Sequence, residues 1–140
     1  MPQPSTAILE TILVVEDDPA ILKMVKLIFE EAGFGVLSAG SGNQARLIEA
    51  GFPQPIHLLL SDVMMQDVSG PELANALKQN RPEMRVMLMS GFADGAMLVL
   101  NHGWHFIAKP FLASALLARV NDVLHSEVRE QRTDRFDTRR

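Results

Sequence analysis

Residues 12–34 read ILVVEDDPAILKMVKLIFEEAGF, and this stretch decides the fold. It opens with four consecutive apolar residues, which is typical of a strand buried on both faces of a parallel sheet. Asp18 and Pro19 suit the start of a helix, because a carboxylate accepts free backbone amides and proline in the first turn loses no hydrogen bond. Apolar residues then recur at helical spacing until Gly33, a residue type favoured after helix ends. The stretch therefore predicts a strand followed by a helix.

The same alternation continues along the chain. Short apolar runs predict further strands at 34–39, 56–61, 85–89 and 104–108, with helices at about 41–50, 71–79, 94–101 and 112–128. Five strand–helix pairs of this kind predict an α/β fold with one open, doubly wound parallel sheet. Ligands of such sheets bind beyond the carboxyl ends of the strands. The residues that follow each strand should therefore be considered together.

Length and composition narrow the class of protein. A chain of 140 residues fits one domain, expected at 10–128, with an N-terminal extension at 1–9 and a charged, flexible tail at 129–140. The absence of cysteine excludes disulfides and thiol chemistry. The net charge is −4, and the acids are concentrated before the tail, which disfavours nucleic acid as a direct partner. No apolar stretch approaches a membrane span and no targeting segment is visible, so we expect a cytoplasmic protein with no membrane partner.

Three acids, a hydroxyl and a lysine follow the predicted strands. Glu16 and Asp17 follow the first strand, Asp62 the third, Ser90 the fourth and Lys109 the fifth. Carboxylates brought close together repel one another unless a hard cation lies among them, and Mg²⁺ prefers such oxygen ligands. A lysine and a hydroxyl suit the oxygens of a transferred phosphoryl group. The pattern predicts magnesium-dependent phosphoryl chemistry, while the neighbouring Pro19 explains Asp18 as a helix cap.

Four motifs, in this order, point to a known family. LVVEDDP (13–19), LLLSDVMMQDVSG (58–70), VMLMSG (86–91) and FIAKPF (106–111) resemble the four signatures of the receiver domain of two-component response regulators, the CheY-like superfamily, across about residues 10–128. The resemblance implies a flavodoxin-like sheet with strand order 2-1-3-4-5. It also implies a signalling domain and not an enzyme, since a receiver catalyses only its own phosphorylation and slow dephosphorylation.

The resemblance assigns a role to each matching position. Asp62 would be the phosphoacceptor and a ligand of Mg²⁺, and Lys109 would pair with the phosphoryl oxygens. Glu16 and Asp17 would be the acidic pair, of which Asp17 would bind the metal directly and Glu16 largely through water. Met64 would lend its backbone carbonyl to the metal. Ser90 and Phe106 would be the switch pair. In the family the switch hydroxyl turns toward the aspartyl phosphate, the aromatic ring swings inward behind it, and the Lys-Pro bond is typically cis.

The function implied by the resemblance is a phosphorylation switch. Asp62 would take a phosphoryl group from the phosphohistidine of a sensor histidine kinase or a histidine phosphotransfer protein. The new charge would bias the surface formed by the fourth helix, fifth strand and fifth helix toward one of two pre-existing states. An output partner would bind this helix4–strand5–helix5 surface, a homodimer could form through it, and Trp104 lies at its edge.

The sequence departs from the family pattern at several positions. Gln66 stands where the family usually has proline, which loosens the loop without touching a reacting group. Met64 and Phe92 occupy the positions that would orient an attacking water, and neither can do so by hydrogen bonding, so we expect a long-lived phosphoaspartate. LMSGFAD (88–94) resembles receivers attached to hybrid sensor kinases, and we expect no output domain within the residues that follow 128. The chain is expected to be a stand-alone receiver or one cut from a longer protein.

Three other functions are compatible with this kind of sheet. A magnesium-dependent phosphatase would need a second aspartate two residues after the nucleophile, where Met64 stands. A flavodoxin-like cofactor carrier would need a phosphate cradle of amides and hydroxyls after the first strand, where this chain has acids. A receiver fold kept only as an interaction module would not require the acids, the hydroxyl and the lysine together.

Overall fold

The computed structural model describes residues 9–91 and 104–125, which form a five-stranded parallel sheet in the order β2-β1-β3-β4-β5. The strands are β1 (Thr11–Val15), β2 (Gly35–Ala39), β3 (Leu58–Asp62), β4 (Arg85–Ser90) and β5 (His105–Ala108). The helices are α1 (Pro19–Glu31), α2 (Gly42–Gly51), α3 (Gly70–Asn80) and α5 (Ala113–His125). The predicted fold class and strand order are confirmed, while the helix expected at 94–101 lies outside the described residues. None of the helices within 9–91 and 104–125 is long and apolar enough to cross a membrane.

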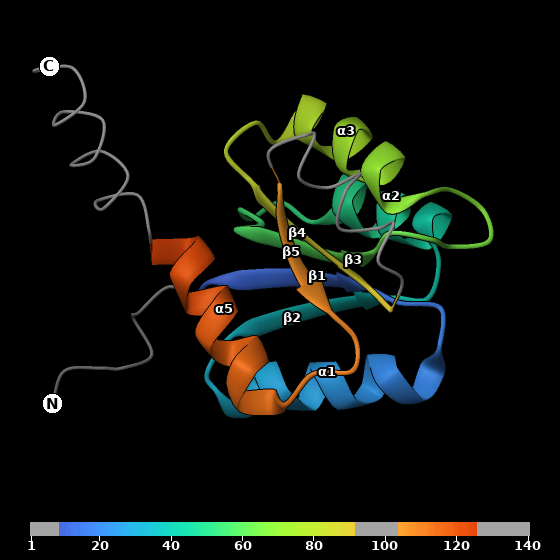
Figure 1. Ribbon diagram of the computed structural model, residues 1–140. Helices are drawn as coiled ribbons and strands as arrows, with labels where there is room; N and C mark the ends of the chain where they lie inside the picture. Colours follow the sequence, from blue (N-terminus) through green and yellow to red (C-terminus); the bar gives the residue numbers. More distant parts are fainter. Residues whose placement is uncertain (1–8, 92–103, 126–140) are drawn as a thin grey trace, which may run out of the picture.

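The helices cover the sheet on both faces. Figure 1 shows α1 and α5 on one face and α2 and α3 on the other. Successive side chains of a strand point to opposite faces, so each strand contributes to two separate cores. Leu13, Leu59 and Leu88 pack on the α2–α3 side, whereas Ile12, Leu60 and Met87 pack on the α1–α5 side. Burial on both faces explains why the central strands are continuous apolar runs.

The first strand–helix unit is built as the sequence predicts. Asp18 caps α1, because its Oδ1 accepts hydrogen bonds from the amides of Ala20 at 2.9 Å and Ile21 at 3.4 Å. Gly33 follows the helix with a φ of 97°, a conformation that residues with a side chain rarely adopt. Ser41 likewise caps α2, since its hydroxyl accepts a hydrogen bond from the amide of Gln44 at 3.1 Å.

Three strands begin one or two residues later than the apolar runs suggest: β2 at Gly35, β3 at Leu58 and β5 at His105. Phe34 lies outside β2, and its ring packs edge-on against Phe29 of α1 at 5.8 Å between centroids. The third strand starts at Leu58 instead of residue 56. Just before it, His57 Nδ1 accepts the hydrogen bond of the Thr11 amide at 2.9 Å, and the His57 amide donates to the Thr11 oxygen at 2.9 Å.

Arg81 joins the ends of α2 and α3. Its Nε donates to Oε2 of the buried Glu49 at 2.8 Å, and its Nη2 donates to the backbone oxygens of Glu49 at 3.0 Å and Phe52 at 2.6 Å. Its Nη1 donates to the backbone oxygen of Gln54 at 2.8 Å. The Glu49 oxygen also accepts from the Phe52 amide at 3.3 Å, so Arg81 adds to the hydrogen bonds that cap the end of α2. One side chain thereby fixes the spacing of the two helices.

Candidate functional site

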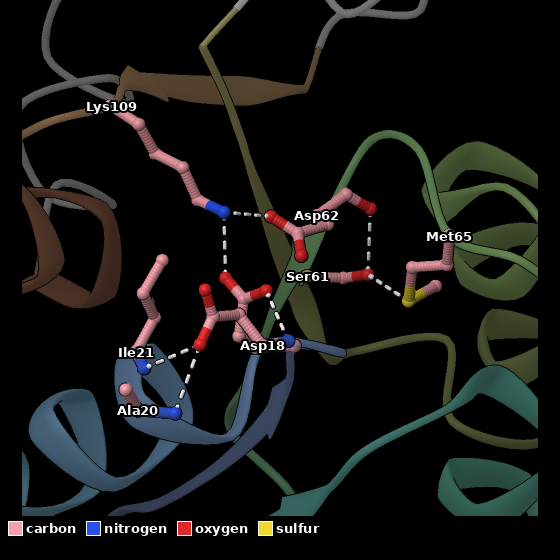
Figure 2. Close-up of polar contacts among 8 residues, drawn as sticks. Asp18, Ala20, Ile21, Ser61, Asp62, Met65 and Lys109 are labelled. Atoms are coloured by element: carbon pink, nitrogen blue, oxygen red, sulfur yellow. Dashed lines mark hydrogen bonds and ion pairs between the residues drawn. The ribbon is translucent and has the colours of Figure 1, made fainter.

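The carboxyl ends of β1, β3 and β5 bring three charged side chains together. Glu16 follows β1, Asp62 ends β3, and Lys109 follows β5. Lys109 Nζ lies 2.6 Å from Glu16 Oε1 and 2.6 Å from Asp62 Oδ1. Figure 2 shows the Lys109 side chain extending from the end of its strand to the Asp62 carboxylate. A single ammonium group therefore bridges two carboxylates at this edge of the sheet.

Backbone hydrogen bonds hold the two outer members of this group in place. The Glu16 amide donates to the Ala39 oxygen at 3.1 Å, and the Lys109 amide donates to the Ser90 oxygen at 2.9 Å. Both bonds continue the sheet ladder one residue beyond the assigned strand. The Lys109-Pro110 peptide bond is cis, as the family resemblance implies. Glu16 Oε2 also accepts a hydrogen bond from the Asp18 amide at 3.0 Å, which orients the Glu16 carboxylate.

The site is buried enough to shift the pKa of each charged group. Burial, with the neighbouring Glu16, raises the pKa of Asp62 to about 7 against the opposing effect of Lys109. Burial also acts to raise the pKa of Glu16, but hydrogen bonds with Asp62, Lys109 and the Asp18 amide outweigh it and leave that pKa lowered. The two carboxylates outweigh burial at Lys109 and raise its pKa. Asp62 is therefore the carboxyl that resists ionisation near neutral pH.

Asp17 completes an acidic cluster suited to a metal ion. Carboxylate oxygens of Glu16, Asp17 and Asp62 all lie within 4.8 Å of one another, with Asp17 exposed and the other two buried. A divalent cation takes oxygen ligands of this kind, and Mg²⁺ usually combines one or two carboxylates with water and phosphate. The donor set and the raised pKa of Asp62 both fit a bound cation, because a positive charge would relieve the carboxylate repulsion. Asp18 stands outside this cluster and caps α1 (Figure 2).

The loop after β3 carries Met64, whose backbone carbonyl is the expected further ligand. The Met64 side chain is 68% exposed, so it does not anchor the loop by burial. Ser61 is buried, and its hydroxyl donates to the Asp62 backbone oxygen at 2.9 Å. At the end of the loop, a β-carbon on Gly70 would collide with the Asp62 backbone oxygen. Glycine is thus required at position 70 for α3 to begin directly against the end of β3.

The expected switch pair occupies two neighbouring strands. Ser90 ends β4 and is buried, while Phe106 lies in β5 opposite Leu88 and is half-buried. By the alternation of strand side chains, Ser90 and Phe106 project from the same face of the sheet. The Phe106 backbone oxygen accepts a hydrogen bond from Arg119 Nη2 of α5 at 2.8 Å. Trp104, at the amino end of β5, is half-buried against the α2–α3 core.

Asp67 is a polar contact of the site region that the sequence does not reveal. Its carboxylate in the β3–α3 loop accepts hydrogen bonds from the first two amides of α2. No motif or spacing marks it, because its partners are backbone groups distant in the chain. The grouping of Glu16, Asp62 and Lys109 was nevertheless predictable, since each of them follows or ends an apolar run.

Comparison with known proteins yields one consistent family. The family model described as the response regulator receiver domain matches residues 12–121 of this chain. The sensor kinase CckA of Brucella abortus is 28% identical over 120 residues, which cover 84% of this chain and 13% of the kinase. The probable transcriptional regulatory protein TcrX of Mycobacterium tuberculosis is 28% identical over 117 residues, covering 81% of this chain and 49% of that regulator. The chain thus spans less than two thirds of the length of these curated relatives.

A solved structure supports the same family. The CheY-like receiver domain protein of Methanospirillum hungatei has a TM-score of 0.78 and 29% sequence identity, over 88% of this chain and 99% of that one. The matched span of residues 12–121 contains the acid, lysine and switch positions described above. Receiver domains are signalling domains of two-component systems. From the match over 12–121 and the shared fold, the chain belongs to the family of response regulator receiver domains.

Proposed function

We propose that this chain is a phosphorylation switch in which Asp62 accepts a phosphoryl group from a phosphohistidine. The donor would be a sensor histidine kinase or a histidine phosphotransfer protein. The observation that carries the proposal is the Lys109 ammonium group, held 2.6 Å from both Asp62 and Glu16. Phosphoryl transfer depends mainly on positioning and on charge stabilisation, and a fixed cation beside a carboxylate nucleophile supplies both.

The proposed step is a displacement at phosphorus. An Asp62 carboxylate oxygen attacks the phosphorus atom, and an O–P bond forms as the P–N bond to the donor imidazole breaks. The donor ring carries a proton on its other nitrogen, and the electron pair of the P–N bond stays on the nitrogen that loses phosphorus, so the donor leaves as a neutral histidine. Lys109, which pairs with Asp62 before the reaction, is placed to pair with the phosphoryl oxygens afterwards. The product is an acyl phosphate on Asp62.

Mg²⁺ fits the acidic cluster and is the proposed cofactor. Glu16, Asp17 and Asp62 would hold it, together with the backbone carbonyl of Met64. When bound, the ion would neutralise charge that collects on the oxygens of the transferred group. Ser90 and Phe106 would then carry the change from the site to the helix4–strand5–helix5 surface, where an output partner or a second copy of the chain would bind.

Intact mass after incubation with acetyl phosphate tests this function. The wild-type protein should gain one phosphoryl group with Mg²⁺ and none in the presence of a chelator. Asp62→Asn should gain none, whereas Asp18→Asn should behave like the wild type because Asp18 caps a helix. An adduct on Asp62→Asn would show that another residue is the phosphoacceptor. A wild-type protein that accepts no phosphoryl group, from acetyl phosphate or from a phosphorylated histidine phosphotransfer protein, would overturn the proposal.

A further inference from the structure

The loop that carries Met64 is fixed at both of its ends. At its start, the Val63 amide donates to the Met89 oxygen at 3.0 Å, and the Val63 oxygen accepts from the Gly70 amide at 2.8 Å. At its end, Ser69 and Glu72 form a reciprocal capping box that starts α3. Between these ends, Met65 packs against the α2–α3 core and the Ser61 hydroxyl lies 3.9 Å from its Sδ, whereas Gln66 and Asp67 are exposed. The exposed part of the loop needs an anchor of its own to hold one conformation.

Asp67 is that anchor. Its Oδ2 accepts a hydrogen bond from the Asn43 amide at 2.8 Å, and its Oδ1 accepts one from the Gly42 amide at 3.2 Å. These are the first two amides of α2, which have no partner within the helix. The two bonds lower the pKa of Asp67, so its carboxylate stays ionised at neutral pH. Among the hydrogen bonds of the described residues, these two tie the exposed part of the loop to another element.

A close apolar contact reinforces this anchor. Val68, the next residue, packs so tightly against α2 that a β-carbon on Gly42 would collide with its Cγ1. The loop and the first turn of α2 therefore touch through a carboxylate and through a side chain. Gln66 precedes this contact, and it lacks the ring with which proline would restrict the backbone. The backbone restraint that a proline at position 66 would provide is thus supplied from Asp67 onward by contacts with α2.

We propose that Asp67 is a positioning residue for the metal site: by binding the first amides of α2, it fixes the loop that presents the Met64 carbonyl. This inference rests on the proposed function, because the Met64 carbonyl matters only if Mg²⁺ binds there. Residues that orient a metal ligand from outside the coordination shell commonly change metal affinity about 10-fold or more when they are removed. The same size of effect is expected for Asp67, although its carboxylate does not reach the acidic cluster.

Mg²⁺ titration of paired variants separates this role from a merely structural one. Asp67→Ala removes the bonds to Gly42 and Asn43, and Ser41→Ala removes the bond to Gln44 at the same end of α2. Both variants lose a cap of α2, so both should melt at lower temperature. Only Asp67→Ala should weaken the binding of Mg²⁺, measured by calorimetry, by about 10-fold. Asp67→Asn keeps one oxygen acceptor and should fall between Asp67→Ala and the wild type.

Hydrogen–deuterium exchange supplies a second readout that needs no metal. The backbone amides of residues 64–67 should exchange faster in Asp67→Ala than in Ser41→Ala. Equal weakening of Mg²⁺ binding in the two variants, or affinity within twofold of the wild type in Asp67→Ala, would overturn the inference while leaving the proposed function intact. A wild-type protein that binds no Mg²⁺ would instead overturn the proposed metal site itself, and the positioning role with it.

Discussion

Lys109 Nζ lies 2.6 Å from Asp62 Oδ1, yet the pKa of Asp62 is raised to about 7. Burial and the nearby Glu16 carboxylate disfavour the ionised form of Asp62 more strongly than the lysine favours it. The single positive charge of Lys109 therefore does not fully compensate the carboxylates of Glu16 and Asp62. A divalent cation would supply that charge, and this deficit gives the site a measurable dependence on pH.

Mg²⁺ should bind more tightly as pH rises through about 7. Binding to the carboxylate of Asp62 must displace its proton below that pH, so metal and proton compete. Between pH 6 and pH 8 the apparent dissociation constant should fall about 10-fold, since one proton is involved. Calorimetric titrations at several pH values would measure this. A constant affinity over that range would show that Asp62 does not lose a proton on binding.

Asp62→Asn should stabilise the metal-free protein at pH 8. A raised pKa in the folded state contributes stability below the unfolded pKa, near 3.8, and that contribution is lost as pH rises through about 7. The ionised Asp62 therefore costs stability at pH 8, and a neutral amide removes that cost. We expect the melting temperature to rise by several degrees at pH 8, corresponding to about 1–2 kcal/mol, and to change less at pH 5. The histidines titrate in both proteins, so their effect cancels when the variant is compared with the wild type. The same difference in melting temperature at pH 5 and pH 8 would contradict the prediction.

Gly42→Ala should destabilise the protein, although alanine is the better helix former. Helix propensity alone would favour alanine by up to about 1 kcal/mol. At Gly42, however, the new β-carbon would collide with Val68, and we expect a net loss of about 1–2 kcal/mol. Gly51→Ala is the matched control at the other end of α2, where open space surrounds the site and a small gain is expected. Urea denaturation of both variants measures the difference, and a gain at position 42 would refute the close contact.

Arg81→Lys should cost about 2–3 kcal/mol, because a lysine cannot replace the fork of the guanidinium group. The substitution would leave the buried Glu49 without its 2.8 Å partner and the Phe52 carbonyl without its donor. Arg46→Lys, on the exposed side of α2, serves as the control and should change the free energy of unfolding by less than about 0.5 kcal/mol. If urea denaturation showed an equally small change in the free energy of unfolding for both variants, the hydrogen bonds of Arg81 would contribute little to stability.

Much of the fold could be predicted because its main signal is local. The central strands are continuous apolar runs, and a parallel sheet with buried faces requires that pattern. Glu16, Asp62 and Lys109 could be grouped for a related reason, since the carboxyl ends of parallel strands meet at one edge. Asp18 could be assigned to a helix cap from its neighbour Pro19 alone. Each of these inferences depends on residues adjacent in the chain or on the topology.

Several contacts that escaped prediction have backbone groups as partners. Asp67 binds amides of α2, Arg81 binds carbonyls at the end of α2, and His57 binds the Thr11 amide. Every residue except proline offers the same backbone donor and acceptor, so the partner positions carry no distinctive residue type. Spatial proximity, and not residue pattern, decides such contacts.

Asp67 and Arg81 connect α2 to the α3 region at both ends of α2. Asp67 ties the first turn of α2 to the loop before α3, and Arg81 ties the end of α3 to the end of α2. Neither helix can separate from the sheet without breaking bonds to the other. Local unfolding on this side of the sheet should therefore be cooperative, with α2, α3 and the loop between Asp62 and Gly70 opening as one unit. The loop that carries Met64 would then share the stability of two helices and not that of an isolated turn.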